Sequence, residues 1–171
     1  KIVCQNISFS IQQGERIALH GKNGCGKSTI LNLIRGEAIE YTGELFTAGN
    51  LKISYVPQTT SHLRGTLAEY ARERQIDESL FKTVLRKLDF ERVQFEKNMA
   101  DYSEGQKKKV LIAASLSESA HLYLWDEPLN FIDVLSRIQI EELLLKYEPT
   151  VLFVEHDTAF TDKIATKTVD L

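Results

Sequence analysis

A loop near the start of the chain has the residue types and the spacing that bind phosphate. Residues 21–28 read Gly-Lys-Asn-Gly-Cys-Gly-Lys-Ser and match the pattern G-x-x-x-x-G-K-[ST] at every fixed position. The glycines would let the backbone curl around phosphate oxygens. Lys27 would reach the β- and γ-phosphates, and Ser28 would offer its hydroxyl to Mg²⁺. A glycine-rich turn without a ligand is the alternative, but the complete match favours a nucleoside triphosphate site.

The segments on either side of this loop are the ones that phosphate binding requires. The apolar run 16–20 predicts a strand, and residues 29–34 predict an amphipathic helix that ends near Gly36. Phosphate would then lie against the free backbone N–H groups at the start of the helix. We therefore expect the nucleotide to contact consecutive residues of the loop and the helix: Asn23, Gly24, Cys25, Gly26, Lys27, Ser28 and Thr29.

Two adjacent carboxylates, Asp126 and Glu127, follow the apolar segment 122–125. That segment predicts a strand buried on both faces, and open α/β sheets bind their ligands at the carboxyl ends of the strands. Asp126 fits the role of holding Mg²⁺ beside Ser28, and Glu127 that of orienting or deprotonating the attacking water. A solvated turn before Pro128 is the alternative, which would leave two carboxylates at a buried strand end without a use.

Two more polar side chains follow predicted strands. His156 comes soon after the strand predicted at 150–154, so it could reach the γ-phosphate. Gln58 comes just after the strand predicted at 51–56, where it could contact Mg²⁺ or the attacking water and report the nucleotide state to the segment that follows. A histidine or a glutamine is also common as a purely structural residue, so neither side chain alone defines a site.

A helix predicted at 105–117 begins with a second candidate site for an anion. Ser103 fits an N-cap, with Gln106 in the capping-box position three residues later. A helix N-terminus with a small residue and a glycine attracts anions. The basic run 107–109 opposes the helix dipole unless an anion or a partner compensates it. A capped surface helix with solvated lysines explains these residues equally well.

The order of the predicted elements indicates the fold class. Strands and helices alternate, with further helices predicted at 134–146 and 157–165 and a last strand at 168–171. This alternation predicts an α/β domain with a mostly parallel sheet covered on both faces. Residues 2–11 predict a strand, in which 6–11 alternate polar and apolar. Residues 44–47 with 51–56 resemble a hairpin, so we expect an antiparallel edge as well.

A polar, helical stretch interrupts this rhythm. Helices are predicted at 66–74 and 78–88, with a shorter segment near 90–95, and charges of both signs crowd the region as on a solvated face. We expect a small helical subdomain, 58–100, inserted into a core formed by 1–57 and 101–171.

The composition is that of an ordinary globular protein. With 171 residues and 43% hydrophobic residues the chain can bury a core as one domain. Its net charge of −3 does not indicate a nucleic acid partner and does not exclude one.

Cys4 and Cys25 form no disulfide framework, which favours a reduced, cytoplasmic setting. No apolar run approaches the roughly 20 residues that cross a bilayer, so we expect no membrane insertion. The start without Met, on a strand-like run from Lys1, suggests a domain of a longer chain.

Together these motifs resemble the nucleotide-binding domain of the ATP-binding cassette (ABC) superfamily, over essentially the whole chain. They occur in that family's order and nearly its spacing as Walker A, Q-loop, signature, Walker B, D-loop and switch histidine: residues 21–28, Gln58, 103–106, 126–127, Asp133 and His156. The resemblance implies an ATPase with the P-loop NTPase fold that uses ATP and Mg²⁺.

The resemblance also implies a partner, because cassettes of this family form their two ATP sites between two domains. Ser103 and Gly105 would touch the γ-phosphate bound by a second cassette, in the same chain or in a homodimer. The sequence departs from the family pattern at Glu104, where glycine is usual, and at 128–133 in the D-loop. The aromatic residue that stacks on adenine in this family would precede Lys1.

Residues 127–133, the short helical insertion and the run 103–109 look like the ABC-F branch. Its members are proteins with two tandem cassettes that act on the ribosome, and the second cassette of the antibiotic-resistance, ribosome-protection type is the most similar. The branch's linker would precede Lys1, so ribosome contact is expected through regions outside these residues. Two alternatives stay open: the motor domain of an ABC transporter, and a nucleotide-gated clamp with little turnover.

Overall fold

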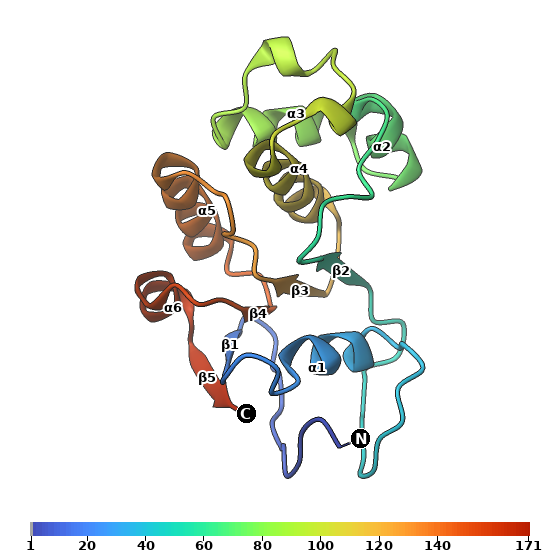
Figure 1. The fold of residues 1–171 in the computed structure, drawn as a ribbon, viewed down its shortest axis with the longest axis vertical. Helices are drawn as coiled ribbons and strands as arrows, with labels where there is room; N and C mark the ends of the chain where they lie inside the picture. The colour runs from blue at the N-terminus through green and yellow to red at the C-terminus, as the bar shows by residue number, and fades with distance from the viewer. Residues whose placement is uncertain (1) are drawn as a thin grey trace.

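A five-stranded sheet lies between layers of helices in the computed structural model of the chain, which describes residues 2–171 (Figure 1). Lys1, part of the strand-like run at the start of the sequence, lies outside them. All pairs of neighbouring strands are parallel, in the spatial order β2-β3-β4-β1-β5. The strands are β1 (Arg16–His20), β2 (Ile53–Val56), β3 (Leu122–Asp126), β4 (Val151–Val154) and β5 (Lys167–Asp170). The parallel α/β sheet expected from the sequence is therefore confirmed.

The two faces of the sheet bury two different hydrophobic clusters. Leu124 and Leu152 are register partners and belong to the cluster under α1 (Lys27–Ile34). Trp125 and Phe153, one residue further along each strand, belong to the cluster on the other face. Successive side chains of a strand point to opposite faces, so the continuous apolar runs of these strands are buried on both sides. Figure 1 shows the helices of the second face: α4 (Glu104–Ser117), α5 (Val134–Tyr147) and α6 (Thr158–Ile164).

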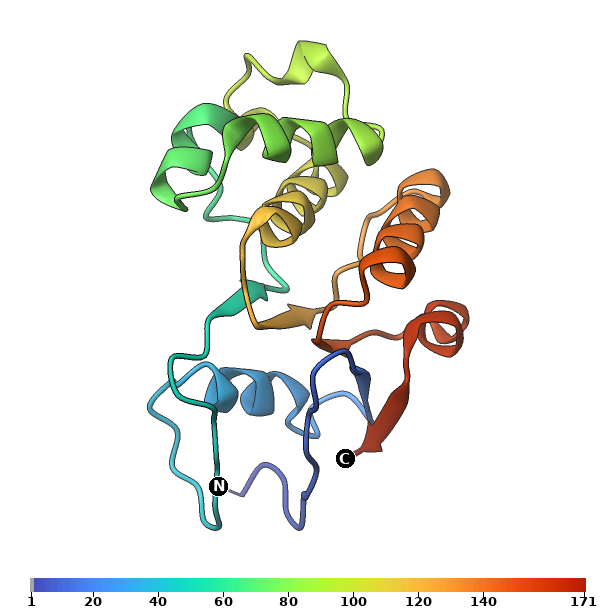
Figure 2. The ribbon, with the colours of Figure 1, turned by 180° about the vertical axis from the view of Figure 1, so that it is seen from behind.

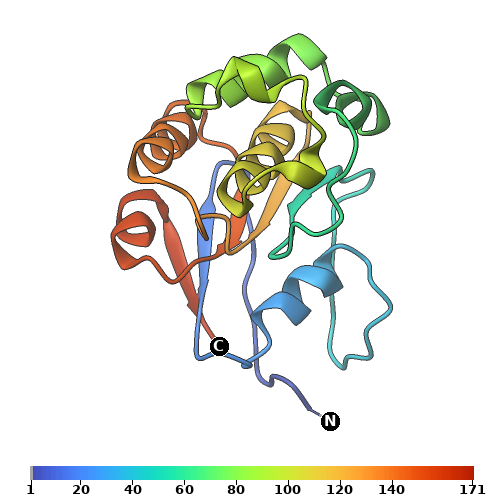
Figure 3. The ribbon, with the colours of Figure 1, turned by 45° about the horizontal axis from the view of Figure 1, so that its top comes forward.

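The predicted helical insertion packs over α4, on its side away from the sheet (Figures 2 and 3). It contains α2 (Leu67–Glu73), α3 (Glu78–Lys87) and two short 3-10 helices, η1 (Arg92–Gln94) and η2 (Met99–Asp101). Thr66 caps α2 with a complete capping box, and Asp77 caps α3 by accepting the backbone N–H of Leu80. The ends of these helices are therefore encoded locally.

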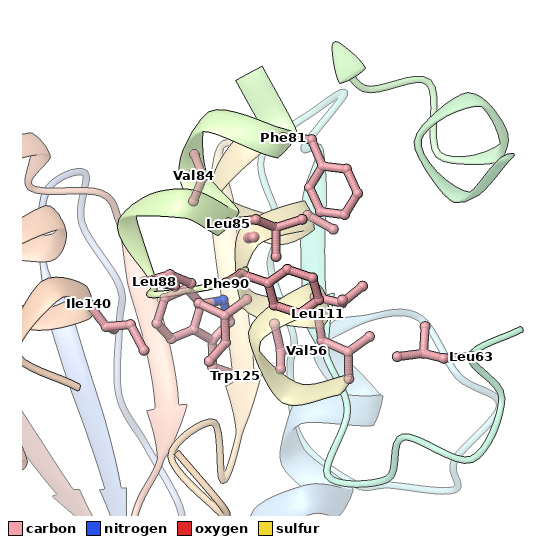
Figure 4. Close-up of a cluster of buried hydrophobic side chains, with 14 of the residues drawn as sticks. Val56, Leu63, Phe81, Val84, Leu85, Leu88, Phe90, Leu111, Trp125 and Ile140 are labelled. Carbon is pink, nitrogen blue, oxygen red and sulfur yellow. The ribbon is translucent and has the colours of Figure 1, made fainter. Parts of the chain in front are cut away.

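This helical region shares its hydrophobic core with the sheet. Phe81 and Leu85 of α3 and the following Phe90 are buried in the same cluster as Leu111 of α4 and Trp125 of β3 (Figure 4). The Trp125 indole N–H donates to the Ser115 hydroxyl at 3.0 Å, which satisfies its polar atom inside the cluster. The insertion and the α/β core therefore stabilise one another, and the boundaries 58 and 100 stay a prediction.

The predicted antiparallel edge is wrong within the described residues. Residues 2–15 and 37–52 contain no strand, and of the predicted hairpin only Ile53–Val56 pairs, parallel to β3. The alternation itself is real, because Ile7, Phe9 and Ile11 are half-buried against the cluster under α1 while the residues between them are exposed. Alternation decides which side chains face a core, but a strand also requires a neighbouring strand at hydrogen-bonding distance.

The other predicted elements form with boundaries shifted by a few residues. The helix predicted at 105–117 begins at Glu104, and the one at 134–146 continues to Tyr147. The segment near 90–95 is a single 3-10 turn, Arg92–Gln94. Fraying and capping shift helix ends by this amount in most proteins.

Removing a buried side chain of α3 should destabilise the whole domain, because α3 belongs to the shared core. We expect Leu85→Ala to lower the free energy of unfolding by about 2–5 kcal/mol, since it leaves a cavity at a fully buried position. Urea unfolding followed by circular dichroism measures the change. Leu80→Ala on the same helix is the control, because Leu80 is 46% exposed. Equal losses in the two variants would show that the helical region does not share the core.

Candidate functional site

The carboxyl ends of the parallel strands bring the predicted site residues to one edge of the sheet. The phosphate loop follows β1, Gln58 follows β2, Glu127 follows β3 and His156 follows β4. Gln58, Glu127 and His156, which are far apart in the sequence, are joined there by hydrogen bonds. Ligands of open α/β sheets bind at this kind of edge.

The last glycine of the phosphate loop, Gly26, could not easily be replaced by another residue. Gly26 is the N-cap of α1 and has φ 105°, in the left-handed region. A Cβ atom on Gly26 would lie 3.0 Å from Val3 Cγ1 and 3.1 Å from Cys4 Sγ. Since a glycine cap carries no side chain, the first N–H groups of α1 are left for a ligand.

Lys27 lies inside the loop and braces it. Its ammonium group donates to the carbonyl oxygens of Gly21 at 2.7 Å and Lys22 at 3.0 Å. An ammonium has three donors, and the third meets only the weakly accepting sulfur of Cys25 at 3.9 Å. The loop is therefore pre-shaped by Lys27, which keeps one donor for an anion.

Asp126 is the candidate metal ligand, and the structure gives it an unusual environment. It is 3% exposed, and its Oδ1 is the one buried side-chain nitrogen or oxygen atom of residues 2–171 without a hydrogen-bond partner. Burial raises the pKa of Asp126, against the lowering effect of the Ser28 hydroxyl. A carboxylate and a hydroxyl are hard oxygen ligands of the kind that Mg²⁺ prefers, and a cation would compensate the orphaned oxygen. Asp126 and Ser28 therefore fit a magnesium site.

Glu127 accepts hydrogen bonds from three side chains. Its Oε1 lies 3.1 Å from His156 Nε2, and its Oε2 accepts from Gln58 Nε2 at 2.9 Å and from Asn130 Nδ2 at 2.8 Å. Burial raises the pKa of Glu127, but the bonds from Asn130, His156 and Gln58 outweigh it and hold that pKa below its usual value. These contacts keep Glu127 ionised.

The backbone of Glu127 is also held in an unusual conformation. Its φ is 50°, in the left-handed region that non-glycine residues avoid at a cost of about 1–3 kcal/mol. Its N–H donates to the Val154 carbonyl at 2.9 Å, which fixes the turn against β4. Backbone strain of this kind clusters at functional sites, although turns elsewhere in this chain, such as those at Gln75 and Asp89, have it too.

The sequence did not identify Asn130 as a site residue, although it contacts Glu127. Asn130 lies in the segment between β3 and α5, three residues after Glu127. The available signal was this spacing, because an amide three residues beyond a strand-end carboxylate can turn back onto it. Gln58, predicted to contact the metal or the water, donates to the same carboxylate oxygen as Asn130, and its metal contact stays a prediction.

Ser103 and Gln106 form the capping box predicted for α4. The Ser103 hydroxyl accepts the Gln106 N–H at 3.2 Å, and the Gln106 side chain accepts the Ser103 N–H at 2.9 Å. Gly105 is needed here for packing, because a Cβ on it would lie 2.6 Å from the Phe131 carbonyl oxygen. Within residues 2–171, no hydrogen bond joins Ser103 or Gly105 to the phosphate loop of the same chain.

The interpretation of 107–109 as solvated lysines is wrong for two of the three. Lys108 is 1% exposed and donates to the Pro57 carbonyl at 2.9 Å. Lys109 is 8% exposed and pairs with Asp133 at 2.7 Å. Burial raises the pKa of Asp133, but the Lys109 ammonium and Ser136 outweigh this and lower it. Partners on neighbouring elements therefore compensate the unfavourable helix dipole.

Comparisons with known proteins agree with this geometry. The chain belongs to the ABC transporter family, whose family model matches residues 4–130; its ATPase domains bind and hydrolyse ATP. ATP-binding protein Uup of Buchnera aphidicola subsp. Acyrthosiphon pisum (strain APS) is 31% identical over 98% of this chain and 29% of Uup. Ribosome protection protein VmlR of Bacillus subtilis (strain 168) is 33% identical over 93% of this chain and 29% of VmlR.

A solved structure described as RNase-L Inhibitor superposes with a TM-score of 0.79 at 30% identity. The superposition covers 94% of this chain and 32% of that one. The chain thus spans about 30% of the length of the curated relatives it matches. None of the helices in residues 2–171 is long and apolar enough to cross a membrane.

A methyl group at Gly105 should destabilise the domain. Alanine favours a helix over glycine by about 1 kcal/mol, but overpacking against a backbone carbonyl costs about 1–3 kcal/mol. We expect Gly105→Ala to lower the free energy of unfolding, measured in urea, because the Phe131 carbonyl must move. Gly49→Ala is the control, since a Cβ there meets open space. A Gly105→Ala variant as stable as the native chain would refute the packing role.

Proposed function

We propose that the edge of the sheet formed by the phosphate loop, Asp126 and Glu127 binds ATP with Mg²⁺ and hydrolyses it to ADP and phosphate. The observation that carries this proposal is the hydrogen bonding of Glu127, a strained, ionised carboxylate next to a buried, partly unsatisfied one. A solvated turn would not require this arrangement. Family membership supports ATP as the nucleotide.

Residues 23–29 would hold the triphosphate. The N–H groups at the start of α1 and the remaining donor of Lys27 would be available to the phosphate oxygens. Asp126 and Ser28 would hold Mg²⁺, which neutralises charge on the β- and γ-phosphate oxygens when bound. The bonds from Lys27 to the Gly21 and Lys22 carbonyls would shape the loop before the nucleotide arrives.

Glu127 would accept a proton from the attacking water. A carboxylate has about four acceptor positions, and Gln58 and Asn130 together occupy both on Oε2. His156 occupies one of the two on Oε1. One position on Oε1 is then left for a water proton. The three donors therefore orient the Glu127 carboxylate as well as keep it ionised. In this proposal His156 and Gln58, which both contact Glu127, would also respond to the γ-phosphate.

A complete site would need a second cassette, in the same chain or in a homodimer. Ser103 is exposed at the N-terminus of α4, and the ABC resemblance pairs this serine and Gly105 with the γ-phosphate held by the opposite domain. The free N–H groups at that N-terminus suit an anion presented from outside the chain.

We also propose that this cassette belongs to an ABC-F protein that works in the cytoplasm on the ribosome, as the second of two cassettes. Two observations support this assignment: the similarity to the ribosome protection protein VmlR, and the resemblance of residues 127–133 to the ABC-F branch. Contacts with the ribosome would come from regions outside these residues. The chain itself would supply the nucleotide-dependent closing and opening.

Replacing the proposed base separates hydrolysis from binding. We expect Glu127→Gln to lower the turnover of ATP by about 10²–10⁴-fold, because the amide cannot take up the water proton. Glutamine has the same shape as glutamate, so the variant should bind ATP with nearly native affinity. Phosphate release measures turnover, and calorimetry measures affinity.

Lys27→Ala is the counterpart, because it removes the ammonium from the loop and should abolish nucleotide binding in the same calorimetric measurement. Unchanged turnover in Glu127→Gln would exclude Glu127 as the base. Binding by the native chain without measurable turnover under any condition would instead favour a nucleotide-gated clamp.

A further inference from the structure

The segment that carries Gln58 is held on both sides by one face of α4. The Pro57 carbonyl, just before Gln58, accepts from Lys108 Nζ at 2.9 Å. The Thr60 hydroxyl, two residues after Gln58, donates to Glu104 Oε2 at 2.5 Å. Residues 104 and 108 are four apart on the helix, so their side chains lie on the same face. The first turns of α4 therefore position Gln58 through its neighbours.

Each of these two contacts has one buried partner, Thr60 in the Gln58 segment and Lys108 in α4. Thr60 is 4% exposed and Lys108 is 1% exposed. A hydrogen bond to a charged group is stronger than one between neutral groups, and breaking it at a buried position leaves a polar group unsatisfied. Movement of the Gln58 segment should therefore strain both bonds and displace the first turn of α4.

Glu104 is adjacent to the two residues of α4 that are candidates for contacting phosphate, Ser103 and Gly105. A displacement of Glu104 would therefore move them. Glu104 lies between Ser103, the N-cap, and Gly105. Its other oxygen, Oε1, accepts from Lys107 Nζ at 3.4 Å. Both oxygens of the Glu104 carboxylate therefore contact residues of this chain. A glycine at this position, as in the usual family pattern, would have no side chain to make the contact with Thr60.

We propose that Glu104 is a positioning residue that, through Thr60, couples the Gln58 segment to the N-terminus of α4. Nucleotide bound at the phosphate loop would move Gln58, and the contact between Thr60 and Glu104 would pass that movement to Ser103 and Gly105. The coupling is reciprocal, so an anion at the N-terminus of α4 would in turn bias Gln58. This inference rests on the proposed function of Gln58 and Ser103.

Hydrogen–deuterium exchange measures this coupling at the N–H groups of Glu104 and Gly105, which lie in the first turn of α4, have no intrahelical partner and exchange readily. The probe is a non-hydrolysable ATP analogue with Mg²⁺. In the native chain we expect it to slow exchange at 21–29, 57–63 and 103–107 by at least about threefold. In Thr60→Val, which keeps the shape but removes the hydroxyl, the slowing at 21–29 should remain and that at 103–107 should disappear.

Three further variants separate coupling from folding. Glu104→Ala removes the other half of the contact and should have the same effect as Thr60→Val. Thr60→Ser keeps the hydroxyl and should restore the native pattern. Thr59→Val is the matched control, because Thr59 is exposed and adjacent, and it should behave as the native chain does.

Two outcomes would overturn the proposal, and they are distinguishable. If 103–107 remain protected in Thr60→Val and Glu104→Ala, or are never protected in the native chain while 21–29 are, the coupling is refuted and the ATP site stands. If the analogue protects none of these regions in the native chain, the proposed nucleotide site fails and the coupling fails with it.

Discussion

The carboxylate of Glu127 is the point at which the chain's separate elements meet. Its three hydrogen bonds come from the ends of β2 and β4 and from the segment before α5, so they hold together parts of the chain that are distant in sequence. Such a cluster forms only when parallel strands end at a common edge. The sheet, with a hydrophobic cluster on each face, supplies that edge, and the helices keep it rigid.

The same edge carries local costs that packing elsewhere must offset. Glu127 has a left-handed backbone, and Asp126 is buried with one oxygen unsatisfied. Gly105 tolerates no side chain because the Phe131 carbonyl approaches it closely. Natural proteins concentrate such violations at functional sites and compensate for them in the core. The shared cluster of α3, α4 and β3 is the largest source of compensation visible in this domain.

Much of this architecture could be predicted from the sequence, because its signals are local. The phosphate loop, the buried strands and the cap at Ser103 depend on neighbouring residues, and the structure has that cap and the buried strands as predicted. The absence of an antiparallel edge could not be predicted from local signals, because the pairing of two strands depends on a partner that is distant in the sequence. The buried lysines of α4 and the contact of Asn130 with Glu127 likewise depend on segments that only folding brings together.

The proposed composite site is tested most directly by the specific ATPase activity of this chain as a function of its concentration. If Ser103 and Gly105 complete the site of a second cassette, activity per chain should be low when dilute and should rise as chains associate. An excess of the inactive Lys27→Ala chain, which still carries Ser103 and Gly105, should raise the activity per native chain further. A specific activity that stays high and constant over about a hundredfold range of concentration would contradict the shared site.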